Sequence, residues 1–410
     1  MSKIKKIQDI LHRENVDAWM FVNDEGKDPY FSNFISPNTS AITVAIITKE
    51  DLYVFVSSLE KEIVEHHVEK AKIKVFTRKE GNTLDELLIE FYREHKELKV
   101  IALNYSTMNN ASTDIIGHGF FEYYTKLLIN NVSHIMQQTF VSAEKIIYAM
   151  IDSKSLEEIK KMEITAIRAR NILEIAFKNI KVGMTELELI DVVHGITEST
   201  REEFIKSYEG FVKEEEYSWE EECCPIVLTG QSFKKGGHAL STDTIIEKGN
   251  TVYFDFGICL TFNDGTRFSS DIQRTGYVIR ENENEPPQEI KKRFQDIIDS
   301  ISLGIDNIKV GMHGYEVDEI VRKYLISKGY PDYDHATGHA IGELTHNPGT
   351  NFTMSNSGTG ALKVQPYGTY TIEPRIPVEN GVSIEEMIVI TENNEVKTLC
   401  ERQMDIILIK

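Results

Sequence analysis

A six-residue segment occurs twice in the sequence, and this repeat constrains the fold more than any other feature. Residues 179–184 are Asn-Ile-Lys-Val-Gly-Met, and the same segment recurs at 307–312, 128 positions later. Each copy follows a helical pattern, turns at a glycine and precedes a second helical pattern, as expected where one helix ends and another begins. Because the flanking patterns also match, we predict that the C-terminal part of the chain consists of two related halves.

The N-terminal part differs, because helical and strand patterns alternate along it. Helical patterns cover 3–15, 64–71 and 83–95, and strand patterns cover 18–22, 41–47, 52–57, 73–77 and 99–105. Strands interleaved with helices at this spacing are typical of an α/β domain with one largely shared sheet. A long charge-rich segment with apolar periodicity follows at 142–180, as expected for a linker and a helix. We therefore predict an N-terminal α/β domain over 1–142 and a second domain over 150–410.

Charge and cysteine content exclude several classes of function. The chain has 65 acidic and 45 basic residues, a formal net charge of −20, so we expect it to repel phosphate backbones and to bind no nucleic acid. No segment approaches the roughly 20 apolar residues that cross a bilayer, and the charged start is unlike a signal peptide. The cysteines, Cys223, Cys224, Cys259 and Cys400, lack the spacing of a zinc site or a disulfide framework. We expect reduced thiols in a cytoplasmic protein that does not contact membranes.

Each predicted half contains a hairpin with acidic residues inside apolar strands. In the first, a turn at 263–265 separates Asp255 from Asp271, so the two carboxylates can approach each other across the ladder. In the second, a turn at 380–381 separates Glu373 from the pair at 385–386, and strand alternation alone does not decide between those two glutamates.

Facing carboxylates repel each other and lose hydration when buried, so this arrangement needs a counter-charge. Arg267 and Arg274 lie nearby in the sequence and are one source of it. Two divalent cations are a better one, because four carboxylates and one neutral imidazole almost balance a dinuclear centre bridged by hydroxide.

Three histidines between 335 and 346 are candidates for that imidazole. His335 and His339 are four residues apart, but Ala336 stands where the zinc-protease helix motif requires Glu, and nearby glycines argue against a continuous helix. His339 and His346 are instead separated by an irregular, glycine-bearing segment, which allows a metal or ligand to come close.

These residues together carry a family resemblance that covers nearly the whole chain. The ordered series resembles the metal-binding series of the pita-bread metallopeptidases, in the aminopeptidase P and prolidase branch: Asp255, Asp271 in SDIQRT, His339 in GHAIGELTH, Glu373 in TIEP and Glu385 in GVSIEE. The resemblance implies an α/β (α+β) protein with an N-terminal creatinase/prolidase-like domain. A C-terminal pita-bread fold with pseudo-twofold halves would follow it, in agreement with the repeat.

The resemblance also implies a role for each residue. Asp255 would bind one metal bidentately, Asp271 and Glu385 would bridge two metals, and His339 and Glu373 would complete the coordination. It selects Glu385 over Glu386. The expected catalytic residues are Glu373 and two histidines near the substrate, His238 and His346, whereas His335 is interpreted as structural.

The implied activity is hydrolysis of small peptides from the amino end at Xaa-Pro bonds, as in aminopeptidase P or Xaa-Pro dipeptidase. Oxygen-rich ligation with a single histidine favours manganese, with cobalt, iron or zinc as alternatives. Relatives have Arg where this chain has Ser383 and Gly where it has Arg375, so Arg375 is predicted to bind substrate from the facing strand. A homodimer is expected from the resemblance.

Two other interpretations are considered. The same shell could act as a peptide- or protein-binding module without catalysis, or as a metal-free hydrolase such as creatinase; the intact series of ligands disfavours both. The acidic segment 211–225 is interpreted as a solvated loop, with a preference for cationic peptides as the alternative and Trp219 as the residue that would reach the cleft.

Overall fold

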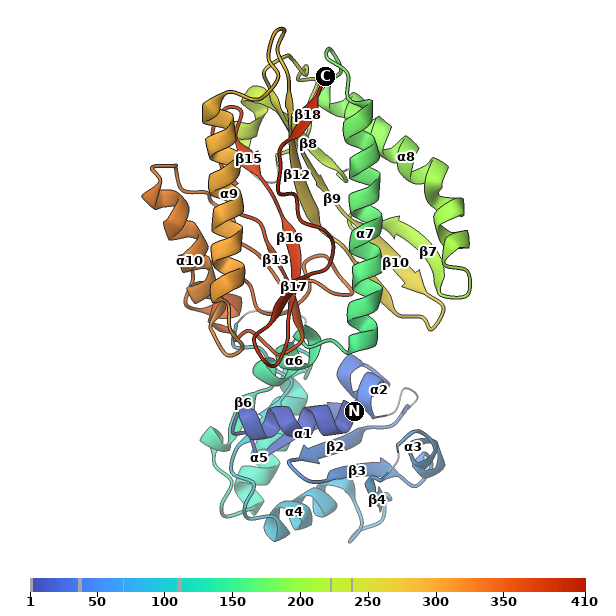
Figure 1. Ribbon diagram of the computed structural model, residues 1–410. Helices are drawn as coiled ribbons and strands as arrows, with labels where there is room; N and C mark the ends of the chain where they lie inside the picture. Colours follow the sequence, from blue (N-terminus) through green and yellow to red (C-terminus); the bar gives the residue numbers. More distant parts are fainter. Residues whose placement is uncertain (1–2, 36–38, 69, 109–112, 222, 237–238) are drawn as a thin grey trace. The chain divides into compact units, whose positions relative to one another are not determined.

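The computed structural model describes residues 3–35, 39–68, 70–108, 113–221, 223–236 and 239–410 (Figure 1). The chain forms two compact units, Met1–Met150 and Ile151–Lys410. Within the described ranges, no helix has the length and apolar character needed to span a membrane.

The first unit contains one sheet with the strand order β4-β3-β2-β1-β5-β6. The strands are β1 (Ala18–Asn23), β2 (Thr43–Thr48), β3 (Leu52–Ser57), β4 (Lys72–Phe76), β5 (Ile101–Leu103) and β6 (Phe140–Ser142). The helices are α1 (Lys3–Arg13), α2 (Pro29–Phe34), α3 (Lys61–His67), α4 (Leu84–Glu94), α5 (His118–Asn131) and α6 (Glu144–Asp152). Pairing is antiparallel between β1 and β2 and between β2 and β3, and parallel elsewhere in the sheet. The alternating patterns of the sequence therefore do share one sheet, as predicted.

The repeated segment closes two equivalent helix-turn-helix units in the second unit. Helix α7 (Leu156–Asn179) precedes α8 (Glu186–Ser207), and α9 (Gln288–Asn307) precedes α10 (Gly314–Ser327). Gly183 and Gly311 occupy the same position in the two turns with φ of 95° and 90°, a left-handed conformation that favours glycine. Their backbone N–H groups donate to Ile246 O and Val364 O, each at 2.9 Å. The expected relationship between the two halves is confirmed.

Both halves contribute strands to the centre of the second unit, flanked by the two helix pairs (Figure 1). The first half supplies β7 (Val212–Tyr217), β8 (Ile226–Thr229), β9 (Thr251–Phe256), β10 (Ile258–Phe262), β11 (Arg267–Ser269) and β12 (Ile272–Val278). The second half supplies β13 (Gly368–Ile372), β14 (Arg375–Ile376), β15 (Val382–Ser383), β16 (Glu386–Ile390), β17 (Val396–Thr398) and β18 (Ile407–Ile409). The sheets are ordered β18-β12-β9-β8, β11-β10-β7, β13-β16-β17 and β14-β15.

The two acidic hairpins each change sheet where their carboxylates lie. In the first, β9 pairs with β12 and the hairpin then continues as β10 paired with β11. Gly257 lies at this crossing, and a Cβ there would be 2.0 Å from Ser270 O, so only glycine allows the two backbones to pass this closely. In the second, β13 pairs with β16 and the hairpin continues as β14 paired with β15. A backbone bridge between Gln273 and Glu385 joins the hairpins.

Candidate metal centre

The structure brings the five predicted metal ligands together. Three overlapping groups of donor atoms each lie within 4.8 Å of one another: Asp255, Asp271 and Glu385; His339, Glu373 and Glu385; and Asp271, His339 and His346. All of the predicted ligands are buried, and they come from both halves of the second unit.

His339 lies in the middle of this cluster. Its Nε2 is 3.7 Å from Asp271 Oδ2, 3.7 Å from Glu373 Oε1 and 3.8 Å from Glu385 Oε1. Its Nδ1 is 3.1 Å from Ala340 O, which can only accept a hydrogen bond. The proton therefore belongs on Nδ1, and Nε2 presents a lone pair to the carboxylates, as a metal-binding imidazole does.

Backbone pairing fixes His339 in place. Its carbonyl accepts from Thr371 N at 2.9 Å, next to the strand that leads to Glu373. The neighbouring Gly338 permits this approach, because a Cβ at that position would be 2.0 Å from Thr371 O. A glycine before the histidine is thus a steric requirement of the site.

The two arginines considered from the sequence pair with carboxylates outside this cluster. Arg274, one of the two arginines considered from the sequence, pairs with Glu386 at 3.1 Å, and Arg267 pairs with the exposed Glu216 at 2.9 Å. Within the described ranges, no lysine or arginine forms an ion pair with Asp271, Glu373 or Glu385. Each arginine thus forms its ion pair with a glutamate outside the cluster, and Arg274 approaches Glu385 only at the backbone carbonyl.

Burial and mutual repulsion act on these carboxylates. Burial first, and the neighbouring carboxylates second, raise the pKa values of Asp271, Glu373 and Glu385 well above their ordinary range. Asp271 Oδ1 and both carboxylate oxygens of Glu385 are buried without a hydrogen-bond donor among the described residues.

Divalent cations fit this donor set. Two donors bound to one ion at about 2.1 Å lie roughly 3 to 4 Å apart, which matches the separations around His339 Nε2. Hard carboxylate oxygens and one neutral imidazole suit manganese, iron, cobalt or zinc. Cations would also satisfy the unpaired oxygens of Asp271 and Glu385.

The remaining predicted histidines differ in where they lie. His346 is exposed, and its ring centroid is 4.6 Å from that of His339. His238 lies outside the described residues. His335, interpreted from the sequence as structural, lines a pocket beside the carboxylates.

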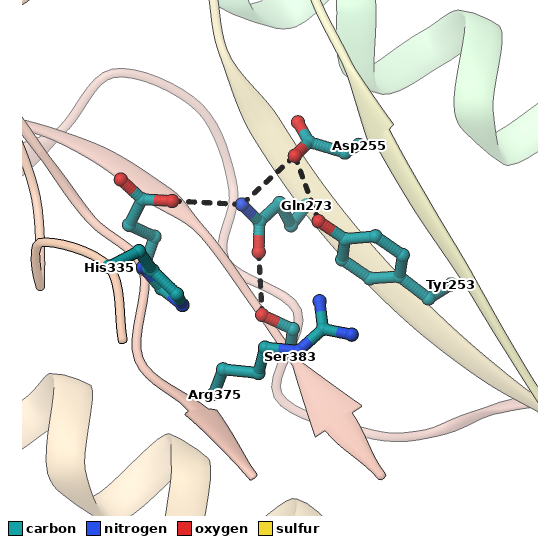
Figure 2. Close-up of a pocket in the computed structure, with 7 residues that line it drawn as sticks. Tyr253, Asp255, Gln273, His335, Arg375 and Ser383 are labelled. Atoms are coloured by element: carbon teal, nitrogen blue, oxygen red, sulfur yellow. Dashed lines mark hydrogen bonds between the residues drawn. The ribbon is translucent and has the colours of Figure 1, made fainter. Parts of the chain in front are cut away.

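That pocket contains Arg375, the predicted substrate-binding residue (Figure 2). Arg375 is buried, and its guanidinium lies over the Phe233 ring, with 4.0 Å from Cζ to the centroid. Nη2 donates to Phe233 O at 2.6 Å, whereas Nε and Nη1 are buried without an acceptor in the described parts of the chain. An incompletely satisfied cation therefore faces the same pocket as Asp255 and Glu373.

Sequence reasoning missed two residues of this pocket. Tyr253 donates from its hydroxyl to Asp255 Oδ2 at 2.8 Å. Gln273 donates from Nε2 to both Asp255 Oδ2 and Glu373 Oε2, and Figure 2 shows its side chain next to Asp255. Tyr253 precedes Asp255 by two residues on the same strand, so strand alternation could have placed both side chains on one face.

The expectation of a solvated loop for the acidic segment is wrong over Val212–Tyr217, which form strand β7, although Glu214 and Glu216 in that strand are exposed. Glu215 on β7 is buried and forms a two-point ion pair with Arg168, at 2.7 and 3.1 Å. Trp219 packs against the hydrophobic core of the second unit. Ser218 O accepts from Thr345 Oγ1 at 3.1 Å, next to His346.

The sequence and this geometry agree with the family comparison. The sequence model of metallopeptidase family M24 matches residues 160–392, which include every residue of the carboxylate and histidine cluster. The chain belongs to metallopeptidase family M24, a family of metal-dependent hydrolases.

Two relatives illustrate how far the similarity extends. The uncharacterized peptidase YqhT of Bacillus subtilis (strain 168) is 35% identical over 176 residues, which cover 42% of this chain and 45% of that protein. An uncharacterized peptidase of Staphylococcus aureus (strain USA300) is 26% identical over 408 residues, covering 98% of this chain and 100% of that protein.

Solved structures share the fold over almost the full length. Xaa-Pro dipeptidase from Bacillus anthracis superimposes with a TM-score of 0.56 at 22% identity, covering 99% of each chain. The N-terminal domain of the FACT complex subunit SPT16 from Eremothecium gossypii superimposes with a TM-score of 0.59 at 15% identity, covering 97% of this chain and 94% of that one. These likenesses confirm the pita-bread fold. Because proteins with such different names share this fold, function has to be inferred from the residues of the site and not from the fold.

Proposed function

We propose that this protein is a dinuclear-metal peptidase that cleaves Xaa-Pro bonds of short peptides from the amino end. The observation that carries the proposal is the convergence of Asp255, Asp271, His339, Glu373 and Glu385. Asp271 Oδ1 and both carboxylate oxygens of Glu385 are buried and have no donor within the described chain. The name of the structurally similar Xaa-Pro dipeptidase supports the choice of substrate.

Bound divalent cations would supply a water of lowered pKa and polarise the scissile carbonyl. His346 is exposed beside His339, where its imidazole can donate a hydrogen bond to the oxyanion that develops from that carbonyl. Glu373 is assigned the transfer of a proton to the departing nitrogen, and its Oε1 faces His339. His238 is assigned a second imidazole contact with the substrate.

The pocket beside the cluster suits a compact residue after the scissile bond. A bond before proline has no N–H, so an enzyme that grips its substrate as a strand loses a hydrogen bond there. The lining supplied by Tyr253, His335, Arg375 and Ser383 offers ring and cation contacts in place of backbone pairing.

The test uses protein freed of metal and then reconstituted with manganese. We expect hydrolysis of an Xaa-Pro dipeptide and an Xaa-Pro-Yaa tripeptide, and much slower hydrolysis of the matched Xaa-Ala peptides. Reconstituted protein that cleaves Xaa-Ala as fast as Xaa-Pro contradicts the proline specificity. Protein that binds no divalent cation contradicts the whole proposal and favours the non-catalytic binding module.

A further inference from the structure

Gln273 on β12 lies at the junction of the two halves. Its backbone pairs with Asp255 in the β9–β12 ladder, and its carbonyl accepts from Glu385 N at 3.2 Å. Its side-chain Nε2 donates to Asp255 Oδ2 at 3.2 Å and to Glu373 Oε2 at 3.0 Å. One buried residue thus contacts three proposed ligands, one from the first half and two from the second.

Ser383 supports the orientation of the Gln273 amide. The Ser383 hydroxyl donates to Gln273 Oε1 at 2.6 Å, on the side of the amide away from the carboxylates. Ionised carboxylates only accept hydrogen bonds, so beside ionised Asp255 and Glu373 a turned amide would place its oxygen against two acceptors, whereas the Ser383 hydroxyl can either donate or accept. The carboxylates thus favour the orientation in which NH₂ is directed at Asp255 and Glu373, and the donated hydrogen bond from Ser383 to Oε1 supports it. Figure 2 shows Gln273 between Asp255 and Ser383.

We propose that Gln273 is a positioning residue of the metal centre, which holds one carboxylate from each half before the cations bind. The inference rests on the proposed metal centre and deepens it. The amide engages Asp255 Oδ2 and Glu373 Oε2, and the other oxygen of Glu373 is the one that lies 3.7 Å from His339 Nε2. Oε2 of Glu373 is thereby held by a hydrogen bond within the protein, and Oε1 is directed toward the proposed metal site.

A carboxamide suits this position because it is neutral. A carboxylate here would add a further negative charge to a cluster of buried carboxylates, and an ammonium group would compete with the cations for the same oxygens. An amide supplies two N–H donors for the two carboxylates and one acceptor for Ser383 at no net charge.

The test is manganese binding by metal-free protein, measured by titration calorimetry, together with the absorption spectrum of the cobalt-loaded protein. Gln273→Met keeps the side-chain length but has no donor, and we expect its manganese affinity to fall about 10-fold or more, as for other residues that orient metal ligands. Ser383→Ala leaves the amide in place but releases its orientation, and it should also weaken manganese binding. Ser383→Thr keeps the hydroxyl and should restore the affinity and the cobalt spectrum.

Gln403 provides the matched control. It is also buried, and its side chain accepts from Thr275 N at 3.0 Å and donates to Thr275 O at 2.6 Å, without contacting a proposed ligand. Gln403→Met should lower the thermal stability while leaving manganese affinity unchanged. Unchanged affinity in both Gln273→Met and Ser383→Ala overturns the inference while the proposed function stands. Unmodified protein that binds no manganese or cobalt overturns both, and if Gln273→Met does not fold, Ser383→Ala and Ser383→Thr decide.

Discussion

Arg375 and Ser383 are direct cross-strand partners in the antiparallel β14–β15 pair. The sequence predicted that Arg375 would act from the strand facing Ser383, and the register places it there. The Ser383 hydroxyl also donates to the Gln273 amide. The strand pair therefore links the Arg375 guanidinium to the Gln273 amide that contacts Asp255 and Glu373.

Replacing Arg375 should weaken the binding of substrates that end in a free carboxylate. Because a charge-assisted hydrogen bond contributes about 1.5–3 kcal/mol, we expect Arg375→Gln to raise KM for an Xaa-Pro dipeptide about 10- to 100-fold. The change in kcat should be small. The dipeptide amide, which lacks the carboxylate, is the control and should respond less. Equal kcat/KM for the dipeptide in both proteins would remove Arg375 from the substrate site.

Glu385→Gln should have opposite effects on metal binding and on the stability of the metal-free protein. Folding raises the pKa of Glu385, so the stability linked to this group is present at low pH and is lost as the pH rises through the raised value. At about pH 8, Glu385→Gln should therefore raise the free energy of unfolding of the metal-free protein, on the order of 1 kcal/mol or more. Manganese affinity should fall sharply, and both quantities can be measured on one preparation.

The adjacent glutamate is the control for that variant. Glu386 is buried and pairs with Arg274 at 3.1 Å instead of joining the cluster. Glu386→Gln leaves that arginine incompletely compensated and should destabilise the protein by about 3–5 kcal/mol, as broken buried pairs do. Manganese affinity should change little. A reversal of the two phenotypes would show that Glu386 is the ligand.

His346 should affect turnover without affecting metal binding. Since its ring is exposed, His346→Gln should fold normally, and loss of an oxyanion donor should lower kcat about 100-fold. Its donor atom also lies within 4.8 Å of Asp271 and His339 donors, so metal affinity must be measured in parallel. A loss of affinity that parallels the loss of kcat would make His346 a ligand and contradict the assigned role.

Asp152 offers a pH-dependent test of buried charge outside the cluster. Its Oδ2 accepts from Thr350 N at 3.0 Å and from Thr350 Oγ1 at 2.8 Å, and burial raises its pKa to about 6. The stability linked to this group is therefore present below about pH 4 and lost as the pH rises through about 6. Asp152→Asn resembles the protonated form, so its stability relative to the unmodified protein should increase between about pH 4 and pH 8, by on the order of 2–3 kcal/mol. Urea unfolding of metal-free protein measures this, and an unchanged difference across that range would contradict the assignment.

Local sequence signals predicted the parts of the fold that depend on local chemistry. The turn at 263–265 and the turns of the repeat can be predicted from the sequence alone. Each contains a glycine in a backbone conformation that few other residues adopt. Helix α5 (His118–Asn131) was not predicted, since its run of Phe and Tyr residues is equally typical of a strand. Helix α2 (Pro29–Phe34) is too short for apolar periodicity to reveal.

The candidate site was predictable where residue type and order were sufficient. The resemblance selected Glu385 over Glu386, and the structure shows why parity could not: Glu386 also points into a buried polar network, with Arg274. The partner of Arg274 and the contact of Gln273 with Glu373 depend on residues that are 112 and 100 positions apart in the sequence. No local pattern carries that information.

The division of the cluster between two halves has a consequence for assembly. Asp255 and Asp271 come from one repeat, whereas His339, Glu373 and Glu385 come from the other, so neither repeat alone would supply all of the proposed metal ligands. The free energy of metal binding would then also stabilise the association of the two repeats. If the chain were cleaved between the two repeats, the two fragments should stay associated while metal ions are bound. They should dissociate more readily after a chelator removes the ions.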